Sequence, residues 1–267
     1  MFYAEARKLY ASVQDQAKQT VTRFQKESAD PYLVNMDDEV DDTAITQKVD
    51  LGVLEIPVRQ IVGIASPDPD MEYTYDFKPL APDSSEFAEF WCQLYLDYLS
   101  DRGLAEPIAC IEYLGRFYVV DGKKRVSVLK AHGEGRVRAQ VTRWIPAYSA
   151  DVQVKQYYAF LNYFPKTGLY QVFLSDAADF PYLQKEMGLA PDQVWTDTDR
   201  YHFLFTFLGI ERAYLELFGE YASFTAADVF VALLKKYSFA KLWLMKYWDL
   251  KEVIGEVVHV GSGTTVA

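Results

Sequence analysis

The sequence predicts an α+β fold, in which a small mixed sheet with helices is followed by an aromatic-rich helical domain. Three observations predict this class. Residues 106–146 show, in order, the patterns of a strand, a tight turn, a second strand, a short helix and a third strand, and such neighbouring elements can share one core. Residues 2–26 repeat apolar positions every three or four residues, as an amphipathic helix does. From residue 151 on, helical patterns rich in Phe, Trp and Tyr replace the strands.

The composition is that of a folded protein with strong negative charge. Of the 267 residues, 50% are hydrophobic and 16% aromatic, and the formal net charge is -11. Apolar runs stay short of the ~18 residues that a membrane span needs, and the charged N-terminus predicts no signal peptide. Cys92 and Cys110, without CxxC spacing, predict reduced thiols and a cytoplasmic location. The net charge disfavours binding of nucleic acid over the whole surface.

The order of these patterns divides the chain into four regions. They are an N-terminal helix with an acidic linker (1–49), a sheet-forming domain (50–147), a helical domain (148–260) and a disordered tail (261–267). The linker contains MDDEVDD at 36–42, and its five carboxylates are of the kind that hard cations bind. Because an EF-hand spacing is absent, we predict a solvated loop there and no metal site.

The first elements of the sheet-forming domain follow from composition and helix signals. Residues 51–64 are rich in Val and Ile, which predicts an extended segment broken by Pro57. Residues 66–83 hold four prolines and show no period, so we expect an irregular loop. Residues 84–102 predict a helix, with a serine at its start as N-cap and Gly103 after its end. We expect the aromatic stripe of this helix to lie in the core.

The most regular stretch begins after this helix. It predicts a strand, a tight turn at 114–116, a second strand that ends near Asp121, a short helix stopped by Gly133, and a third strand that ends before Pro146. Helical patterns then cover 151–163, 176–187, 199–218 and 226–247, the last with a capping-box-like start at Thr225–Asp228.

The turn between the second strand and the short helix concentrates positive charge in an acidic chain. The N-terminal end of a helix carries partial positive charge and unpaired N–H groups, so it prefers Asp or Glu. Cations at this position are explained by a bound anion, because backbone N–H groups, ammonium groups and a guanidinium would then converge on phosphate oxygens. The alternative is a solvated basic helix face. We predict a phosphate site formed by Asp121, Gly122, Lys123, Lys124, Arg125 and Ser127.

The positive charge extends beyond the turn. Residues 112–143 carry eight cations against three acids, a local net charge of +5. The cations are Arg116, Lys123, Lys124, Arg125, Lys130, Arg136, Arg138 and Arg143. We therefore expect a basic patch around the turn.

A family resemblance supports the phosphate site. LEIPVRQIVGI and EPIACIEYLGRFYVVDGKKRVSVLKAHGEGRVRAQVTRW, within about residues 50–145, resemble the ParB/sulfiredoxin-type domain. That family has an IPV strand, a variable segment, a core ending in YYVVDG, and a phosphate-binding Gly-x-x-Arg turn. The resemblance implies that Gly122 to Arg125 binds a nucleoside di- or triphosphate, CTP or ATP/ADP, with or without Mg²⁺. YYAFLNYFPKTGL at 157–169 resembles the helical segment that follows this domain in bacterial ParB-like proteins.

The chain departs from the family's known activities at the same turn. Lys123 stands where sulfiredoxins carry their catalytic cysteine, so sulfinic acid reduction is not expected. Lys123 and Lys124 replace the Glu and first Arg of the partition-type turn, and residues 151–250 lack the pattern of a helix-turn-helix, which makes DNA a doubtful partner. The fold also resembles free-serine kinases, which use a glutamate as general base; Glu55 is the candidate here.

We therefore expect a ParB-like protein that binds a nucleotide or phosphate ligand at the Gly122–Arg125 turn and acts as a regulator. One alternative is a nucleotide-dependent small-molecule kinase of the serine type, which would need a metal and a catalytic carboxylate, either Glu55 or one from the loop 66–76. A second alternative is a DNA-binding protein of the partition or transcription-related kind, and a third is an interaction protein that has lost the ligand. Whether the chain is an enzyme stays open. The aromatic helices predict a homodimer or a protein partner, and no membrane contact is predicted.

Overall fold

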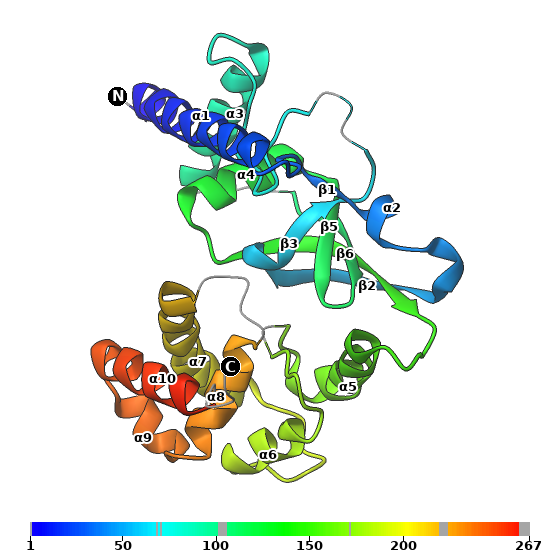
Figure 1. Ribbon diagram of the computed structural model, residues 1–267, viewed down its shortest axis with the longest axis vertical. Coiled ribbons are helices and arrows are strands. Elements are labelled where there is room, and N and C mark those ends of the chain that lie inside the picture. Colours follow the sequence, from blue (N-terminus) through cyan, green and yellow to red (C-terminus); the bar gives the residue numbers. More distant parts are fainter. Residues whose placement is uncertain are drawn as a thin grey trace. The chain divides into compact units, whose positions relative to one another are not determined.

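The computed structural model of the protein describes residues 2–67, 69, 71–100, 106–170, 172–218 and 224–261. The chain forms two compact units, Met1–Ala147 and Tyr148–Ala267 (Figure 1). Within the described residues, the named strands all belong to the first unit, and the second unit is built from helices.

A mixed sheet lies at the centre of the first unit. Its described strands are β1 (Val34–Asn35), β2 (Ile45–Pro57), β3 (Ile61–Ile64), β4 (Ile108–Tyr113), β5 (Arg116–Asp121) and β6 (Arg136–Pro146). Across the sheet they lie in the order β1-β3-β5-β4-β6-β2 (Figure 1). The pairs β1–β3, β3–β5 and β4–β6 are parallel, whereas β4–β5 and β2–β6 are antiparallel. This mixed sheet with its helices confirms the predicted α+β class.

The β4–β5 hairpin turns through Leu114 and Gly115, as the sequence predicts. Tyr113 pairs with Arg116, and the two residues between them have φ angles of 49° and 77°. Both angles lie in the left-handed region that a two-residue type I′ turn requires to match the twist of its strands. The N–H of Gly115 donates to the buried Glu112 carboxylate (2.8 Å), so the turn is held from inside the sheet.

Strand β2 begins earlier than predicted. Residues 45–49 were expected in the linker, but they pair with the end of β6, where Ile45 lies opposite Pro146. Most side chains in this part of β2 are polar and exposed, so the alternation that marks a strand is absent. The other end follows the prediction, because β2 stops at Pro57 and a 3-10 turn, η2 (Val58–Gln60), leads into β3.

The acidic stretch 36–42 forms two short helical elements. These are α2 (Met36–Glu39) and the 3-10 turn η1 (Asp42–Ala44). Glu39 accepts a hydrogen bond from the Tyr118 hydroxyl on β5 (2.5 Å), and Asp41 accepts one from the Thr43 N–H (2.9 Å). These two carboxylates therefore serve local structure.

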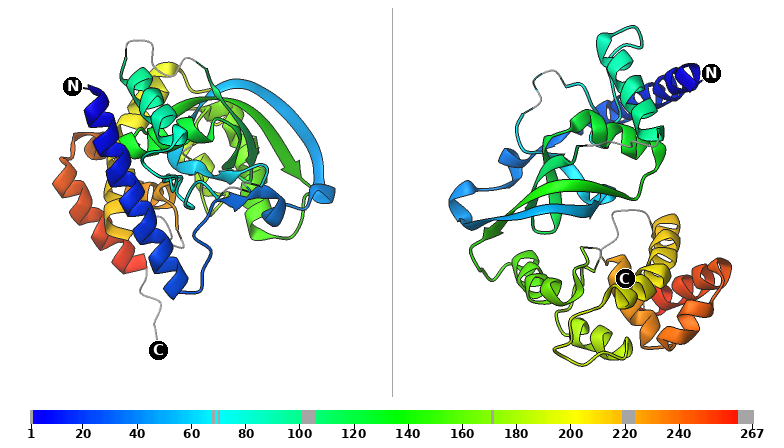
Figure 2. Two further views of the ribbon diagram at one scale, coloured as in Figure 1. Left: turned by 90° about the horizontal axis from the view of Figure 1, so that it is seen from above. Right: turned by 180° about the vertical axis from the view of Figure 1, so that it is seen from behind.

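Three helices complete the first unit: α1 (Phe2–Lys26), α3 (Glu86–Leu99) and α4 (Lys123–His132). Figures 1 and 2 show α1 lying alongside α3. Trp91 of α3 is fully buried, and its ring meets Tyr10 of α1 edge-on at a centroid distance of 5.3 Å. The indole N–H donates to the Ser127 hydroxyl of α4 (2.9 Å). Trp91 of α3 thus contacts both α1 and α4.

The start of α3 and the end of α4 agree with the helix signals of the sequence. Ser85 caps α3 by accepting a hydrogen bond from the Ala88 N–H, and Gly133 ends α4 in the left-handed conformation. The predicted end of α3 at Gly103 lies outside the described residues; the helix stops at Leu99.

The second unit consists of helices in its described part. They are α5 (Val152–Thr167), α6 (Asp179–Glu186), α7 (Asp197–Phe218), α8 (Ala226–Leu234), α9 (Phe239–Leu244) and α10 (Tyr247–Gly261). The predicted helix 226–247 is divided, because Ser238 caps a new helix after α8 ends. The predicted capping box at Thr225 and Asp228 is present.

Helix α10 begins at Tyr247, the last residue of the predicted helix 226–247, and continues through residues that showed no predicted element to Gly261, the first residue of the predicted tail. The rest of that tail, 262–267, lies outside the described residues. Among the helices that the structure describes, none is long and apolar enough to cross a membrane.

A hydrogen bond between α3 and the turn after α4 predicts a pH dependence. The Tyr98 hydroxyl donates to the Glu134 carboxylate. This bond lowers the pKa of Glu134 from 4.5, while burial and the same bond raise the pKa of Tyr98 from 10.0 to about 12. The carboxyl therefore stabilises the fold above pH 4.5 and loses this effect as the pH falls further. The phenol stabilises the fold below pH 10 and loses this effect as the pH rises toward 12.

We expect Tyr98→Phe to lower the melting temperature most near neutral pH, and its difference from the unmodified protein to shrink below about pH 4 and above about pH 10. Thermal unfolding followed by circular dichroism across this range measures the difference. A difference that stays constant from acid to alkali contradicts the assignment.

Candidate functional site

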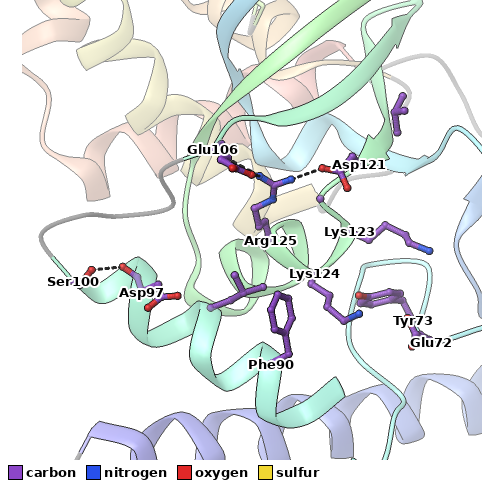
Figure 3. A pocket seen from close by; sticks show the side chains of 13 residues that line it. Glu72, Tyr73, Phe90, Asp97, Ser100, Glu106, Asp121, Lys123, Lys124 and Arg125 are labelled. Atoms are coloured by element: carbon purple, nitrogen blue, oxygen red, sulfur yellow. Dashed lines mark hydrogen bonds and ion pairs between the residues drawn. The ribbon is translucent and has the colours of Figure 1, made fainter. Parts of the chain in front are cut away.

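A pocket of about 750 Å³ opens at the N-terminal end of α4 (Figure 3). The start of α4 and the end of β5 form one wall, and α3 forms another. The loop before α3 and the segment before β4 complete the described rim. The described lining residues are Glu72, Tyr73, Phe90, Leu94, Asp97, Ser100, Glu106, Val120, Asp121, Gly122, Lys123, Lys124 and Arg125.

Gly122 makes the sharp passage from β5 into α4. Its φ of 104° lies in the left-handed region, where a side chain would be strained. A Cβ at this position would also lie 2.7 Å from Cγ2 of Ile108 and 3.0 Å from Nε of Arg125. Gly122 has no side chain that could cap the start of α4. The turn therefore requires glycine both for its backbone conformation and for its close contacts.

Arg125 is the most constrained cation of the turn. One guanidinium nitrogen donates to the Asp121 carboxylate (2.5 Å), and another donates to the carbonyl oxygens of Glu106 (3.0 Å) and Pro107 (3.2 Å). Its side chain is only 14% exposed. Arg125 thus holds the end of β5 against the segment that leads into β4, and a phosphate would share the guanidinium with Asp121.

The two lysines point to the other side of the pocket. Figure 3 shows Lys123 and Lys124 extending toward Glu72 and Tyr73, away from the Arg125 guanidinium. The Lys124 ammonium lies over two α3 rings, 4.6 Å from the centroid of Phe87 and 5.8 Å from that of Phe90. The pocket therefore has cations along the start of α4, with aromatic rings beside them.

Carboxylates also line the pocket, and one of them, Asp121, is a predicted site residue. Glu72, Asp97, Glu106 and Asp121 lie around its rim. In the described ranges no group of three potential metal ligands is close enough to hold a metal ion. These acids are therefore separate hydrogen-bond acceptors, placed around a cationic centre.

Ser127 does not belong to the site. Its side chain is 1% exposed and accepts the hydrogen bond from Trp91. Ser127 is on the buried face of α4, whereas residues 123–125 reach the pocket. The prediction that Ser127 contacts the ligand is corrected: it anchors α4 to α3.

Glu55 also lies away from the site. Asp121 on β5 pairs through β4 and β6 with Val53 on β2, so the two residues lie in one row across the sheet. Three strand spacings of about 4.8 Å separate them, which puts Val53 ~14 Å from the turn. Glu55 is two residues further along β2 and forms an ion pair with Arg136 (3.5 Å). Its predicted role as a general base at the turn is therefore corrected.

The predicted basic patch is not continuous. Arg143 is buried and pairs with Glu112, and the Lys130 ammonium donates to the Ile61 carbonyl (2.9 Å). Arg136 pairs with Glu55. These three cations have partners within the first unit. The eight cations counted in the sequence therefore do not form one basic surface.

Helix α3 supplies the residues that sequence reasoning missed. Phe90 and Leu94 were expected in the core, but they line the pocket together with Asp97. Their spacing of four and three residues places them on one face of the helix. That spacing was visible in the sequence, but it did not show that this part of the face meets a cavity.

Two comparisons with known proteins were negative. A scan against protein-family models finds no match for the chain, and a search of curated proteins finds none either. The resemblance to the ParB/sulfiredoxin-type domain therefore rests on the sequence motifs alone and stays a prediction.

Proposed function

We propose that the pocket binds a nucleoside di- or triphosphate, CTP or ATP/ADP, with its phosphates at the start of α4. The observation that carries this proposal is the uncapped helix start after Gly122, opening into a pocket together with Lys123 and Lys124. A helix N-terminus attracts phosphate through its N–H groups and its dipole. The volume of about 750 Å³ is in the range of pockets that enclose ligands of this size.

We also propose that the first unit is a ParB/sulfiredoxin-type domain with a regulatory role. The order of β4, β5, α4 and β6 around the glycine turn supports this assignment. The helical second unit would then transmit the bound state to a partner or to a second copy. Large apolar side chains exposed on that unit are consistent with such a contact; they include Tyr201, Phe205, Leu208, Leu244 and Trp248.

Isothermal titration calorimetry with CTP, ATP, ADP and GTP, with and without Mg²⁺, tests nucleotide binding. We expect binding of at least one nucleotide and a loss of about tenfold or more in affinity for Lys124→Ala, because a charge-assisted hydrogen bond contributes about 1.5–3 kcal/mol. Lys155→Ala is the matched control, since this exposed lysine lies on α5 in the other unit. Absence of heat with all four nucleotides would refute the proposal.

The serine-type kinase remains the second candidate because one observation favours it. Glu55 is remote from the turn, but Glu72, from the loop before α3, supplies a carboxylate to the pocket. A general base must lie within hydrogen-bond reach of the hydroxyl that it deprotonates, and Glu72 meets the requirement of facing the ligand space. DNA binding has less support, because Arg125, Arg136 and Arg143 each pair with a carboxylate within the first unit. The cytoplasmic location also stays a prediction.

A further inference from the structure

The pocket contains apolar surface that is exposed in the described part of the structure. Phe90 is 55% exposed and Val120 is 57% exposed, and both line the pocket. Exposure of a single apolar side chain on a convex surface is ordinary, but here two of them face a concave site that also contains cations. Inorganic phosphate or a small sugar phosphate would leave this surface in water. The ligand therefore has a planar or apolar part next to its anionic part.

Helix α3 presents three kinds of chemistry to the pocket along one face. Phe90 offers a ring, Leu94 an aliphatic side chain and Asp97 an exposed carboxylate. The carboxylate accepts a hydrogen bond from Gln93 on the same helix (2.9 Å), which orients it. An aromatic ring stacks on nucleobases of any sequence, whereas a carboxylate accepts hydrogen bonds and repels carbonyl oxygens.

The aromatic wall and the cationic turn are close enough to act on one ligand. The Lys124 ammonium lies 5.8 Å from the Phe90 centroid, while the backbone of Lys124 belongs to the first turn of α4. The buried hydrogen bond between Trp91 and Ser127 fixes α3 against α4. A ligand with its phosphates at the turn therefore has its remaining part beside α3.

We propose that Phe90 stacks on the base of the bound nucleotide and that Asp97 accepts a hydrogen bond from an exocyclic amino group of that base. The site then selects cytosine over uracil, and adenine over hypoxanthine, because the disfavoured bases present a carbonyl oxygen where the favoured ones present an amino group. This selectivity rests on the proposed nucleotide binding.

Calorimetric titrations with two pairs of nucleotides, and with one phosphate chain that carries no base, test the selectivity. The ligands are CTP against UTP, ATP against ITP, and tripolyphosphate, which has no nucleoside. We expect CTP or ATP to bind more tightly than its keto counterpart and than tripolyphosphate. Phe90→Ala should weaken binding of the nucleotide about tenfold and leave the affinity for tripolyphosphate unchanged. Asp97→Asn should reduce the preference for the amino base about tenfold.

Phe205→Ala is the matched control, because Phe205 is 56% exposed and lies in the other unit. Equal affinity for CTP, UTP and tripolyphosphate, with no effect of Phe90→Ala, overturns the inference and leaves phosphate binding intact. A preference for the amino base that survives Asp97→Asn overturns the role of Asp97. If neither tripolyphosphate nor any nucleotide binds, both this inference and the proposed function are wrong.

Discussion

Replacement of Glu112 by alanine is expected to lower the free energy of unfolding of the first unit by about 3–5 kcal/mol. Glu112 is fully buried in β4 and pairs with Arg143 in β6, which is 8% exposed at its side chain. It also accepts the hydrogen bond from Gly115 that holds the hairpin turn. The substitution leaves a buried guanidinium without its counter-charge, and this loss costs more than the pair itself contributes.

Urea unfolding followed by circular dichroism measures this loss. Removing both partners, with Glu112→Leu and Arg143→Leu together, should restore much of the stability, because an apolar pair of similar volume often replaces a buried ion pair at little cost. A change below about 1 kcal/mol for Glu112→Ala, the size of an exposed pair, would contradict the buried placement of these two residues.

Replacement of Trp91 by alanine, as a single substitution, is expected to lower the free energy of unfolding by about 3–5 kcal/mol. This is the range for loss of a fully buried large aromatic side chain. Its ring contacts Tyr10 and stacks on Tyr95 at a centroid distance of 6.0 Å. It also holds α4 through Ser127. We expect the pocket to loosen, because α3 and α4 form two of its walls, so nucleotide affinity should fall together with stability.

Trp195→Ala is the matched control for this second substitution. Trp195 is also almost fully buried and donates to Gln184 (2.7 Å), but it lies in the helical unit. Both variants should unfold at lower urea concentration, and only Trp91→Ala should weaken nucleotide binding under conditions where the protein stays folded. Equal binding by the two variants would show that the Trp91 contacts do not shape the site.

Elements with local signals could be predicted from the sequence. The turn at Leu114 and Gly115, the helix boundaries at Gly122 and Gly133, and the capping box at Thr225 each depend on residues within about four positions of one another. Local conformational preference decides such features before tertiary packing contributes. The cationic turn belongs to this group as a local feature, whereas its position beside a pocket depends on the packing of α3.

Features that depend on distant segments could not be predicted. Ser127 is only two residues after Arg125 in the chain. Its contact with Trp91, which places it on the buried face of α4, depends on the packing of α3. Glu55 adjoins the family-like motif, yet the strand order puts β2 at the far edge of the sheet from the turn. Phe90 faces the pocket because α3, more than twenty residues earlier in the chain, packs beside α4.

The ion pair between Arg125 and Asp121 gives the guanidinium of the turn an internal counter-charge. A phosphate that binds as proposed would therefore share this guanidinium with the carboxylate of Asp121. Small ions such as chloride offer the guanidinium no better partner than the carboxylate that it already holds. Under the proposed function, the turn favours a ligand that also engages the lysines and the helix N–H groups over a simple anion.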